Sequence, residues 1–238
     1  MTDAHCHVSC GDPAVRELLV GRDFFGVHPW ATLNETAETS FSIVPDIQFL
    51  SALRAKLLAN PTAGVGEIGL DRLKCRDILP RMREVFEAQL ALAIELNRPV
   101  VLHGAKCWGQ VVAAVRAFSS RQPLIQTIKQ SNNQTLPPLL FHGFSRSDGL
   151  ISDIVKLNGF ISVGPAVLND HAVNYRELVK KIPLDRLLVE TDRTEANATD
   201  CPSVRDVLAK VAELRGISAA ELEKITDENV EKFFGASL

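Results

Sequence analysis

Short apolar runs alternate along the chain with longer segments in which apolar residues recur at helical spacing. A run of four to eight apolar residues bounded by turn residues is typical of a buried strand. Alternation of such strands with helices indicates a parallel sheet or barrel of the α/β class. Seven strands are expected on this basis, at residues 2–8, 24–28, 63–68, 99–103, 139–142, 160–163 and 187–190.

Two segments between these strands have a clear helical stripe. Residues 46–59 place five apolar side chains on one face, and residues 80–97 place four there: Ile47, Leu50, Leu53, Leu57 and Leu58 in the first, and Met82, Phe86, Leu90 and Ile94 in the second. Both are expected to cover a barrel from outside.

Start and stop signals predict two further helices, and two polar stretches are expected to be loops. A helix is expected from about Ser203 to Gly216, and the spacing of Ser218 and Glu221 predicts the start of a short terminal helix. Residues 31–45 and 119–138 are rich in Ser, Thr, Asn and Gln, which favours surface loops.

Length and composition favour one domain over residues 1–238. The 238 residues are 46% hydrophobic, enough for one buried core. A net charge of −3 argues against a protein that coats duplex DNA, although an enzyme that uses cations can still act on nucleic acid. The five cysteines contain no CxxC pair and are expected to be reduced thiols. Without an expected membrane span or signal peptide, we expect a cytoplasmic or nuclear protein.

Two histidines near the start of the chain share one face of a predicted strand. His5 and His7 are two residues apart, so both can reach one ion, whereas Cys6 between them is expected to pack on the other face. An isolated pair of this kind is about as often two unrelated histidines, so the ends of the other strands decide the interpretation.

Four more possible ligands end predicted strands. Glu67 would be costly to bury alone, and a strand-terminal imidazole or carboxylate follows three other apolar runs, at His103, His142 and Asp192. In a closed α/β barrel the carboxyl ends of the strands converge on one face. Imidazoles and carboxylates without a thiolate cluster suit Zn, Mn, Fe or Mg. The sequence therefore predicts a divalent metal centre on that face.

Seven short motifs resemble, in order, those of the TatD-related metal-dependent hydrolases. They are DAHCH (3–7), GVHPW (26–30), GEIGLD (66–71), PVVLH (99–103), LLFHGFS (139–145), LLVETD (187–192) and TDENVEKFFG (226–235). The HPW, LHG and IPLDRLLVETD forms are most similar to the fungal branch that includes Cut9-interacting-type proteins.

The resemblance implies a TIM barrel of the amidohydrolase superfamily that holds one to three divalent ions, with two (Mg, Mn or Zn) expected here. It also implies hydrolysis of phosphoester bonds, as in a 3′-5′ exonuclease-like deoxyribonuclease. By motif, His5, His7 and Asp192 would bind one ion, Glu67 would bridge to a second, and His103 and His142 would complete that site. Asp192 would also act as general base, and Glu67 would position the second ion.

The chain departs from the family pattern at three places. The short gap from His7 to the GVHP motif leaves no room for a full strand and helix, so we expect one strand/helix unit to be missing near residues 8–25, or an irregular strand at 18–20 or 41–44. Lys106 and Arg193 stand in altered loops, and with His28 they are candidate substrate contacts. An open barrel edge would favour a protein partner or a homodimer.

Three functions fit these residues. The first is hydrolysis of a phosphoester bond, with nucleic-acid ends or another small phosphoester as substrate. The second is hydrolysis of an amide or lactone on the same metal site. The third is a partner-binding protein that keeps a vestigial metal site, against which the intact ligand set argues. No membrane association is expected.

Overall fold

A computed structural model shows an α/β barrel, as the strand and helix pattern predicts. The structure describes residues 1–33, 47–74, 79–121, 136–145 and 148–235. No helix within these ranges is both long and apolar enough to cross a membrane.

The main sheet has six parallel strands in the order in which they follow one another along the chain. They are β3 (Phe24–Phe25), β4 (Gly64–Asp71), β5 (Val100–Ala105), β6 (Leu139–Phe141), β7 (Gly159–Val163) and β8 (Leu187–Val189). β1 (Thr2–Cys6) and β2 (Arg16–Leu19) form a second, parallel pair. All seven strands that the sequence predicts are therefore present, although β3 is shorter than expected.

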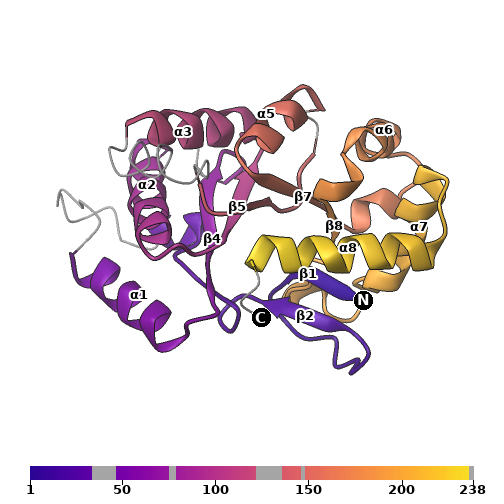
Figure 1. The fold of residues 1–238 in the computed structure, drawn as a ribbon, viewed down its shortest axis with the longest axis horizontal. Helices are drawn as coiled ribbons and strands as arrows, with labels where there is room; N and C mark the ends of the chain where they lie inside the picture. The colour runs from indigo at the N-terminus through magenta and orange to yellow at the C-terminus, as the bar shows by residue number, and fades with distance from the viewer. Residues whose placement is uncertain (34–46, 75–78, 122–135, 146–147, 236–238) are drawn as a thin grey trace.

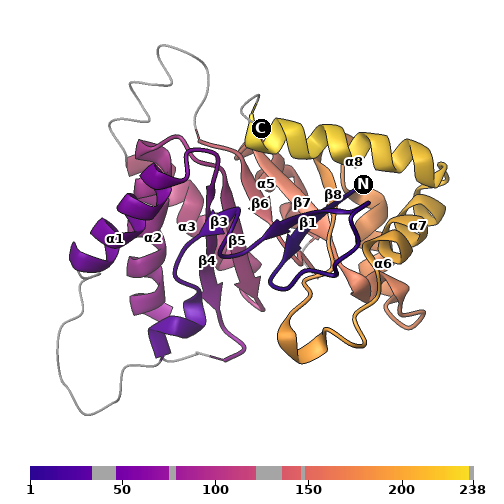
Figure 2. The same cartoon turned by 90° about the horizontal axis from the view of Figure 1, so that it is seen from below.

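Backbone contacts join the two sheets on both sides. On one side, the Asp192 amide donates to the His5 carbonyl, and the His7 amide donates to the Arg193 carbonyl. On the other side, an isolated parallel bridge links Val20 to Phe24. Eight strands therefore surround a common interior, with β1 and β2 between β8 and β3 (Figure 2).

The expectation of a missing strand/helix unit near residues 8–25 is corrected in part. A strand is present at β2, where the candidate at 18–20 placed it, and residues 7–23 contain no helix. β2 has the burial pattern exposed, buried, buried, intermediate, in which Arg16 is exposed and the carboxylate of Glu17 is buried. The other candidate strand, at 41–44, lies outside the described residues.

The helices lie around the strands in Figure 1. They are α1 (Ile47–Ala59), α2 (Leu79–Glu95), α3 (Trp108–Arg121), α5 (Ile151–Lys156), α6 (Val173–Lys181), α7 (Val204–Arg215) and α8 (Ala219–Phe234). The predicted stripe of α2 is confirmed, since Met82, Phe86 and Leu90 are buried. In α1, Leu53 and Leu57 are buried but Leu58 is 60% exposed, so the stripe is narrower than expected.

Capping residues define where the last two helices begin. The Ser203 side chain accepts from the Asp206 amide at the start of α7, and Gly216 ends that helix with φ of 66°. The Ser218 side chain accepts from the Glu221 amide at the start of α8, as the spacing predicts. α8 is 16 residues long and not short. Most of the two polar stretches predicted as loops lies outside the described residues.

The barrel interior is divided into an apolar layer and a polar layer. The apolar layer consists of Ala4, Leu18, Phe24, Val101, Leu140, Phe160 and Leu188, with Val230 and Phe233 of α8 packed against it. Two residues further along four strands, on the same inward side, stand polar side chains: His103, His142, Ser162 and Glu190. Because side chains alternate along a strand with a period of two, these polar side chains lie directly above a hydrophobic base.

Candidate metal centre

Glu67 lies at the centre of the polar layer and faces histidines from several strands. Its side chain is 2% exposed. A close approach of β4 to β5 brings it near His103: Gly69 has φ of 148°, and a Cβ there would lie 2.1 Å from the His103 carbonyl oxygen. A side chain at position 69 would therefore push the two strands apart.

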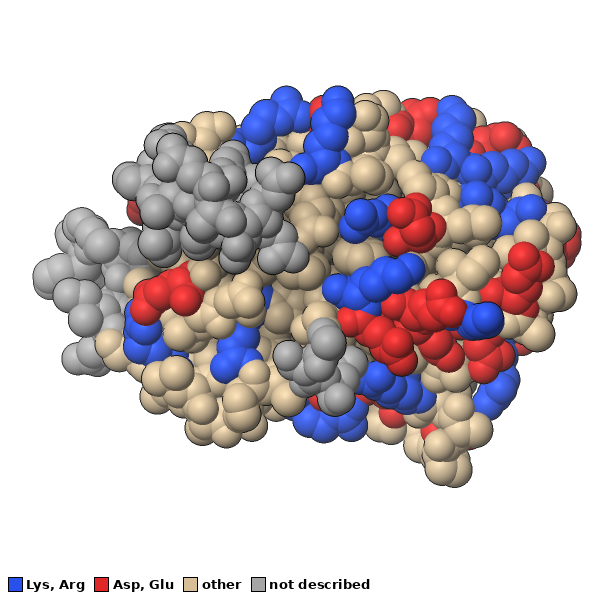
Figure 3. Space-filling view, in the orientation of Figure 1, with Lys and Arg blue, Asp and Glu red and all other residues tan. Residues whose placement is uncertain are grey.

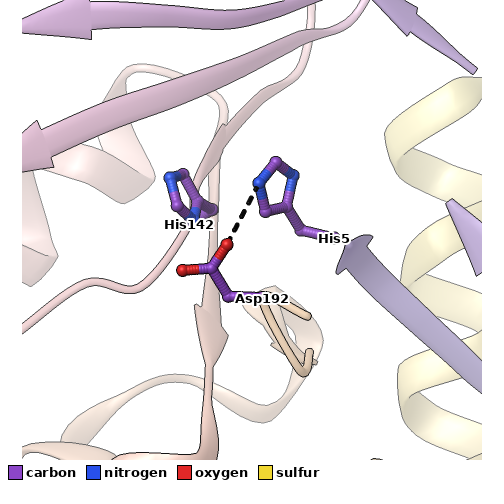
Figure 4. Close-up of side chains that lie close together, drawn as sticks. All are labelled: His5, His142 and Asp192. Carbon is purple, nitrogen blue, oxygen red and sulfur yellow. Dashed lines mark ion pairs between the residues drawn. The ribbon is translucent and has the colours of Figure 1, made fainter. Parts of the chain in front are cut away.

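One oxygen of Glu67 faces His5 of β1 and His7, which directly follows the end of that strand. His5 Nε2 lies 3.4 Å and His7 Nε2 3.3 Å from Glu67 Oε2. Asp192 Oδ1 is 3.8 Å from His5 Nε2 and 3.6 Å from His7 Nε2. Figure 4 shows the carboxylate of Asp192 pointing toward the His5 ring, with His142 on its other side. Asp192 holds this position with φ of 49°, a left-handed conformation that is uncommon for aspartate.

The other oxygen of Glu67 faces three more histidines. His142 Nε2 lies 2.7 Å and His28 Nε2 3.3 Å from Glu67 Oε1, and His103 Nδ1 also contacts this oxygen. The other five side chains that the sequence predicts as ligands therefore lie around Glu67, which is the sixth. His28, expected as a substrate contact, lies in the same cluster.

The donor atoms fit divalent cations. Three groups have one ligand atom from each member within 4.8 Å of one another: His5, His142 and Asp192; His5, His7 and Glu67; and His28, Glu67 and His103. Both ring nitrogens of the fully buried His5, and Nδ1 of His142, have no hydrogen-bond partner in the described structure. A buried imidazole without partners is costly, and a cation on its nitrogen would satisfy it.

Mutual charge interactions shift the pKa values of these groups. Burial alone would raise the pKa of Glu67, but the charge of His142 and hydrogen bonds from the surrounding histidines lower it well below its usual value. Burial opposes protonation of His142, yet the Glu67 charge raises the pKa of His142 well above its usual value. Burial raises the pKa of Asp192. Protons and cations thus compete for the same nitrogens.

Glu190 orients His142 from below. It is fully buried, and its Oε1 accepts from the Gly143 amide at 2.6 Å and lies 3.6 Å from His142 Nδ1. Its Oε2 accepts from the Ser162 hydroxyl at 2.5 Å. Carboxylates in this position keep a ligating imidazole in one orientation.

Asp71 supports the other side of the cluster. Its side chain is fully buried, and its Oδ2 lies 3.2 Å from His103 Nε2 and accepts from Trp30 Nε1 at 2.5 Å. Its Oδ1 accepts from the amides of Leu73 and Lys74. Although burial opposes ionisation, the bonds from His103 and Trp30 lower the pKa of Asp71.

The cluster opens into a pocket with a volume of about 760 Å³. The pocket walls include Trp30, Lys74 and Thr194 together with five of the predicted ligands, His7, Glu67, His103, His142 and Asp192. A substrate can therefore reach the cluster from solvent.

Two of the predicted substrate contacts lie outside the pocket lining. Lys106 is exposed, with φ of 54°. Arg193 is directed into its own loop, where its guanidinium donates to the carbonyls of Ala198 and Cys201. Cys6 is buried and contacts the Leu18 carbonyl, in agreement with the packing role expected for it.

Sequence reasoning overlooked three residues of the site: Glu190, Asp71 and Trp30. Glu190 could have been found by its position, since it follows the inward Leu188 by two residues. Asp71 and Trp30 meet across 41 residues of sequence. No local pattern marks such a contact.

Comparisons with known proteins agree with this geometry. The model of the TatD-related DNase family matches residues 21–235. The chain is 28% identical over 232 residues to YabD of Bacillus subtilis, an uncharacterized metal-dependent hydrolase, with 92% of this chain and 80% of that protein covered. It is 29% identical over 183 residues to the 3′-5′ ssDNA/RNA exonuclease TatD of Klebsiella pneumoniae, with 72% of this chain and 64% of that protein covered.

A solved structure shows the same fold. The crystal structure of the TatD homolog YjjV from Escherichia coli K12 superimposes with a TM-score of 0.72 at 21% identity, covering 98% of this chain and 97% of that one. The family match spans most of the chain, and the TIM-barrel fold is shared. The chain therefore belongs to the TatD-related DNase family and is a metal-dependent hydrolase.

Proposed function

We propose that this protein is a nuclease that hydrolyses phosphodiester bonds at the 3′ ends of DNA or RNA strands. The observation that carries the proposal is the arrangement of five histidines around the two oxygens of Glu67, with Asp192 beside two of them. The name of the Klebsiella relative, a 3′-5′ exonuclease on single-stranded DNA and RNA, supports the choice of substrate.

Two divalent ions, Mg, Mn or Zn, are proposed as cofactors. His5, His7 and Asp192 would hold one and His103 and His142 the other, with Glu67 between them. Bound there, the ions would supply Lewis acidity to the phosphoryl group and to the attacking water. The two separate oxygens of Glu67, each facing its own group of histidines, support two ions rather than one.

We assign proton transfer to Asp192. It is half-exposed at the pocket, close to His5 and His7, so its carboxylate can accept the proton of an attacking water. Glu67, whose pKa is lowered by the charge and hydrogen bonds of the surrounding histidines, is suited to remain an anion between them.

The test is hydrolysis of 3′-recessed and single-stranded DNA with Mg or Mn by the wild type and by Asp192→Asn. Loss of a general base is expected to lower the rate about 10²- to 10⁴-fold. Asp185→Asn is a matched control, because Asp185 is an exposed carboxylate that precedes the same strand at the opposite end. Equal rates for Asp192→Asn and the wild type would refute the assignment.

The same assay separates the competing functions. Turnover of amides or lactones but not of DNA would identify the alternative hydrolase, because ions held by these residues would polarise a carbonyl as well as a phosphoryl group. Binding of no cation by the purified protein, measured by metal analysis, would favour a partner-binding role. The complete donor set in the described structure supports the hydrolase over the partner-binding role.

The sequence also supports proposals about the extent of the domain, the cellular location and the branch of the family. We infer one domain over residues 1–238, a location in the cytoplasm or nucleus, and a position near the fungal Cut9-interacting-type branch, supported by the HPW, LHG and IPLDRLLVETD forms. The four described cysteines are free, which supports a reducing compartment. We do not extend the proposal to a partner protein or homodimer, because β2 occupies the barrel edge on which that expectation rested.

A further inference from the structure

Trp30 is an aromatic side chain held in an exposed position at the mouth of the pocket. It is 41% exposed, whereas Trp108, the only other tryptophan, is 5% exposed. The bond from Trp30 Nε1 to the buried carboxylate of Asp71 anchors one edge of the ring. An indole that is fixed by its polar edge in a pocket wall and is partly exposed can present its ring to a ligand.

The ring also lies next to the reactive cluster. Its centroid is 4.6 Å from that of His28 and 6.1 Å from that of His103, and both contacts are edge-on. Because Asp71 contacts Trp30 and His103 together, the indole has a defined position relative to the cluster. A planar group stacked on Trp30 would therefore lie beside the bond to be broken.

A lysine covers the indole. Lys74 Nζ lies 3.3 Å from the centroid of the Trp30 ring, and Lys74 is exposed. Among the described residues that line the pocket, it is the only lysine or arginine, while Glu67, Asp192 and Glu195 are acidic. A cation on an exposed aromatic face is weakly held, so a stacking ligand can displace it. The freed ammonium would then be available to an anionic group of that ligand.

We propose that Trp30 and Lys74 form the subsite for the terminal nucleoside of the substrate, with the base stacked on the indole and Lys74 paired with a neighbouring phosphate. This inference rests on the proposed nuclease function and specifies how it selects its substrate. A base can stack on protein only when it is not paired within a duplex. The subsite therefore favours single-stranded 3′ ends.

The proposed recognition is local, because it needs one stacked base and one lysine at the pocket. Figure 3 shows the opposite side of the barrel, where α8 covers the apolar base and acidic and basic side chains are interspersed.

The first experiment measures how much the terminal base contributes to binding. Single-stranded oligonucleotides with a phosphorothioate linkage at the 3′ end are prepared with a 3′-terminal thymidine or with an abasic residue. The wild type is expected to bind the thymidine form about 5- to 100-fold more tightly, the range for one stacked base. Quenching of tryptophan fluorescence on binding should report Trp30, because Trp108 is buried.

Variants assign this difference to Trp30. Trp30→Ala is expected to bind both oligonucleotides equally and at the weaker level, whereas Trp30→Phe, which keeps an aromatic face, should retain most of the preference. Leu73→Ala is the control, because Leu73 is an exposed apolar residue next to Lys74, on the turn after β4, that does not line the pocket, and it should behave as the wild type. Thermal unfolding identifies any variant that does not fold.

A salt titration tests Lys74. Lys74→Ala should weaken binding of both oligonucleotides by a similar factor and reduce the slope of log K against log salt by about 0.7, the value for one phosphate contact on a single strand. Lys74→Arg should keep the slope. Lys156→Ala, at the end of α5, is the matched control with no expected effect.

The outcomes separate the two proposals. Equal binding of the thymidine and abasic forms by the wild type, or retention of the preference in Trp30→Ala, would overturn the subsite while leaving nuclease activity standing. An unchanged salt slope in Lys74→Ala would overturn the phosphate contact. A wild type that neither binds nor hydrolyses oligonucleotides would overturn both the nuclease function and the subsite.

Discussion

The two layers of the barrel interior stand two residues apart on the same strands but have opposite energetic roles. The apolar layer buries Val101, Leu140, Phe160 and Leu188, each of which is at most 2% exposed. The polar layer above it buries imidazoles and carboxylates. Burial costs these groups their hydration, and hydrogen bonds and charge interactions among them compensate that loss. The apolar layer therefore stabilises the fold without a ligand, whereas the contribution of the polar layer to stability depends on the protons or cations that it binds.

This difference explains why the polar layer is confined to one end. Each buried charge is expensive unless it is paired or coordinated, and a barrel of this size can accommodate such a group only where a hydrophobic base carries the stability. The predictions below test this division, from the largest expected effect to the smallest.

Phe233→Ala should destabilise the protein most, by about 3–5 kcal/mol, because it opens a cavity at the base of the interior. The Phe233 ring lies 6.2 Å from that of Phe24 and 5.9 Å from that of Phe160, measured between centroids. Denaturant unfolding followed by circular dichroism measures the loss. Val173→Ala, on a side chain that is 60% exposed, is the control. A loss below about 1 kcal/mol would show that the base of the barrel is not the stabilising layer.

Glu67→Gln should remove most of the stabilisation that divalent cations give to the folded protein. In the wild type, a cation at 100 times its dissociation constant is expected to add about 2.7 kcal/mol to the free energy of unfolding. Glu67 faces both groups of histidines, so its neutral amide should remove most of this gain. Thermal shift with Mn or Zn against a chelator measures it, with the exposed Glu228→Gln as control. A full shift in Glu67→Gln would mean that the cations bind elsewhere.

Glu190→Gln should weaken cation binding by about 10- to 100-fold, the usual effect of losing a carboxylate that orients a ligating histidine. Glutamine has nearly the same size and shape as glutamate, so the substitution removes only the negative charge beside His142 Nδ1. Calorimetric titration with the cation is the measurement. Ser162→Ala, which deletes only the hydroxyl bonded to Glu190, should have a smaller effect in the same direction. A larger loss of cation binding in Ser162→Ala than in Glu190→Gln would contradict the role of Glu190 in orienting His142.

Asp3→Asn should change how stability depends on pH, by roughly 1 to 3 kcal/mol between pH 5 and pH 8. Burial raises the pKa of Asp3 to about 7, although bonds from Thr191 oppose the shift. Between about pH 4 and pH 7 the folded wild type binds a proton at Asp3 that the unfolded chain releases, so its stability falls as pH rises.

The asparagine variant lacks this proton and should therefore gain stability relative to the wild type from pH 5 to pH 8. Unfolding with chelator present, compared at the two pH values, measures the difference between the two proteins. A constant difference at both values would show that Asp3 is ionised in the folded protein throughout.

The sequence predicts most of the fold because strand identity is local. Short apolar runs bounded by turn residues marked seven strands, and α2 showed a clear helical stripe. β2 was harder to assign because its four residues start with Arg16 and Glu17, and its pairing with β1 makes it a strand. Leu58 has the right spacing for burial but is exposed, because α1 presents a narrower face to the barrel than its sequence pattern does.

The candidate site was accessible to sequence reasoning for a topological reason. Parallel strands in a barrel end on one face, so six strand-terminal ligands could be grouped without knowing any distance. Their gathering around Glu67 agrees with that expectation, while ligation of an ion stays a prediction. Trp30 and Asp71 were not foreseen because their roles depend on a contact between distant segments and on exposed area.

The packing of α8 against the base of the barrel has a consequence for the order of folding. Phe233 contacts Phe24, more than 200 residues earlier in the chain, so the apolar base is completed only after the chain has been synthesised beyond residue 233. Contacts of such separation slow folding, and until α8 docks the lower ends of the strands expose Phe24 and Phe160 to other chains. A ribosome-bound nascent chain that stops before α8 should therefore be prone to aggregation and to chaperone capture.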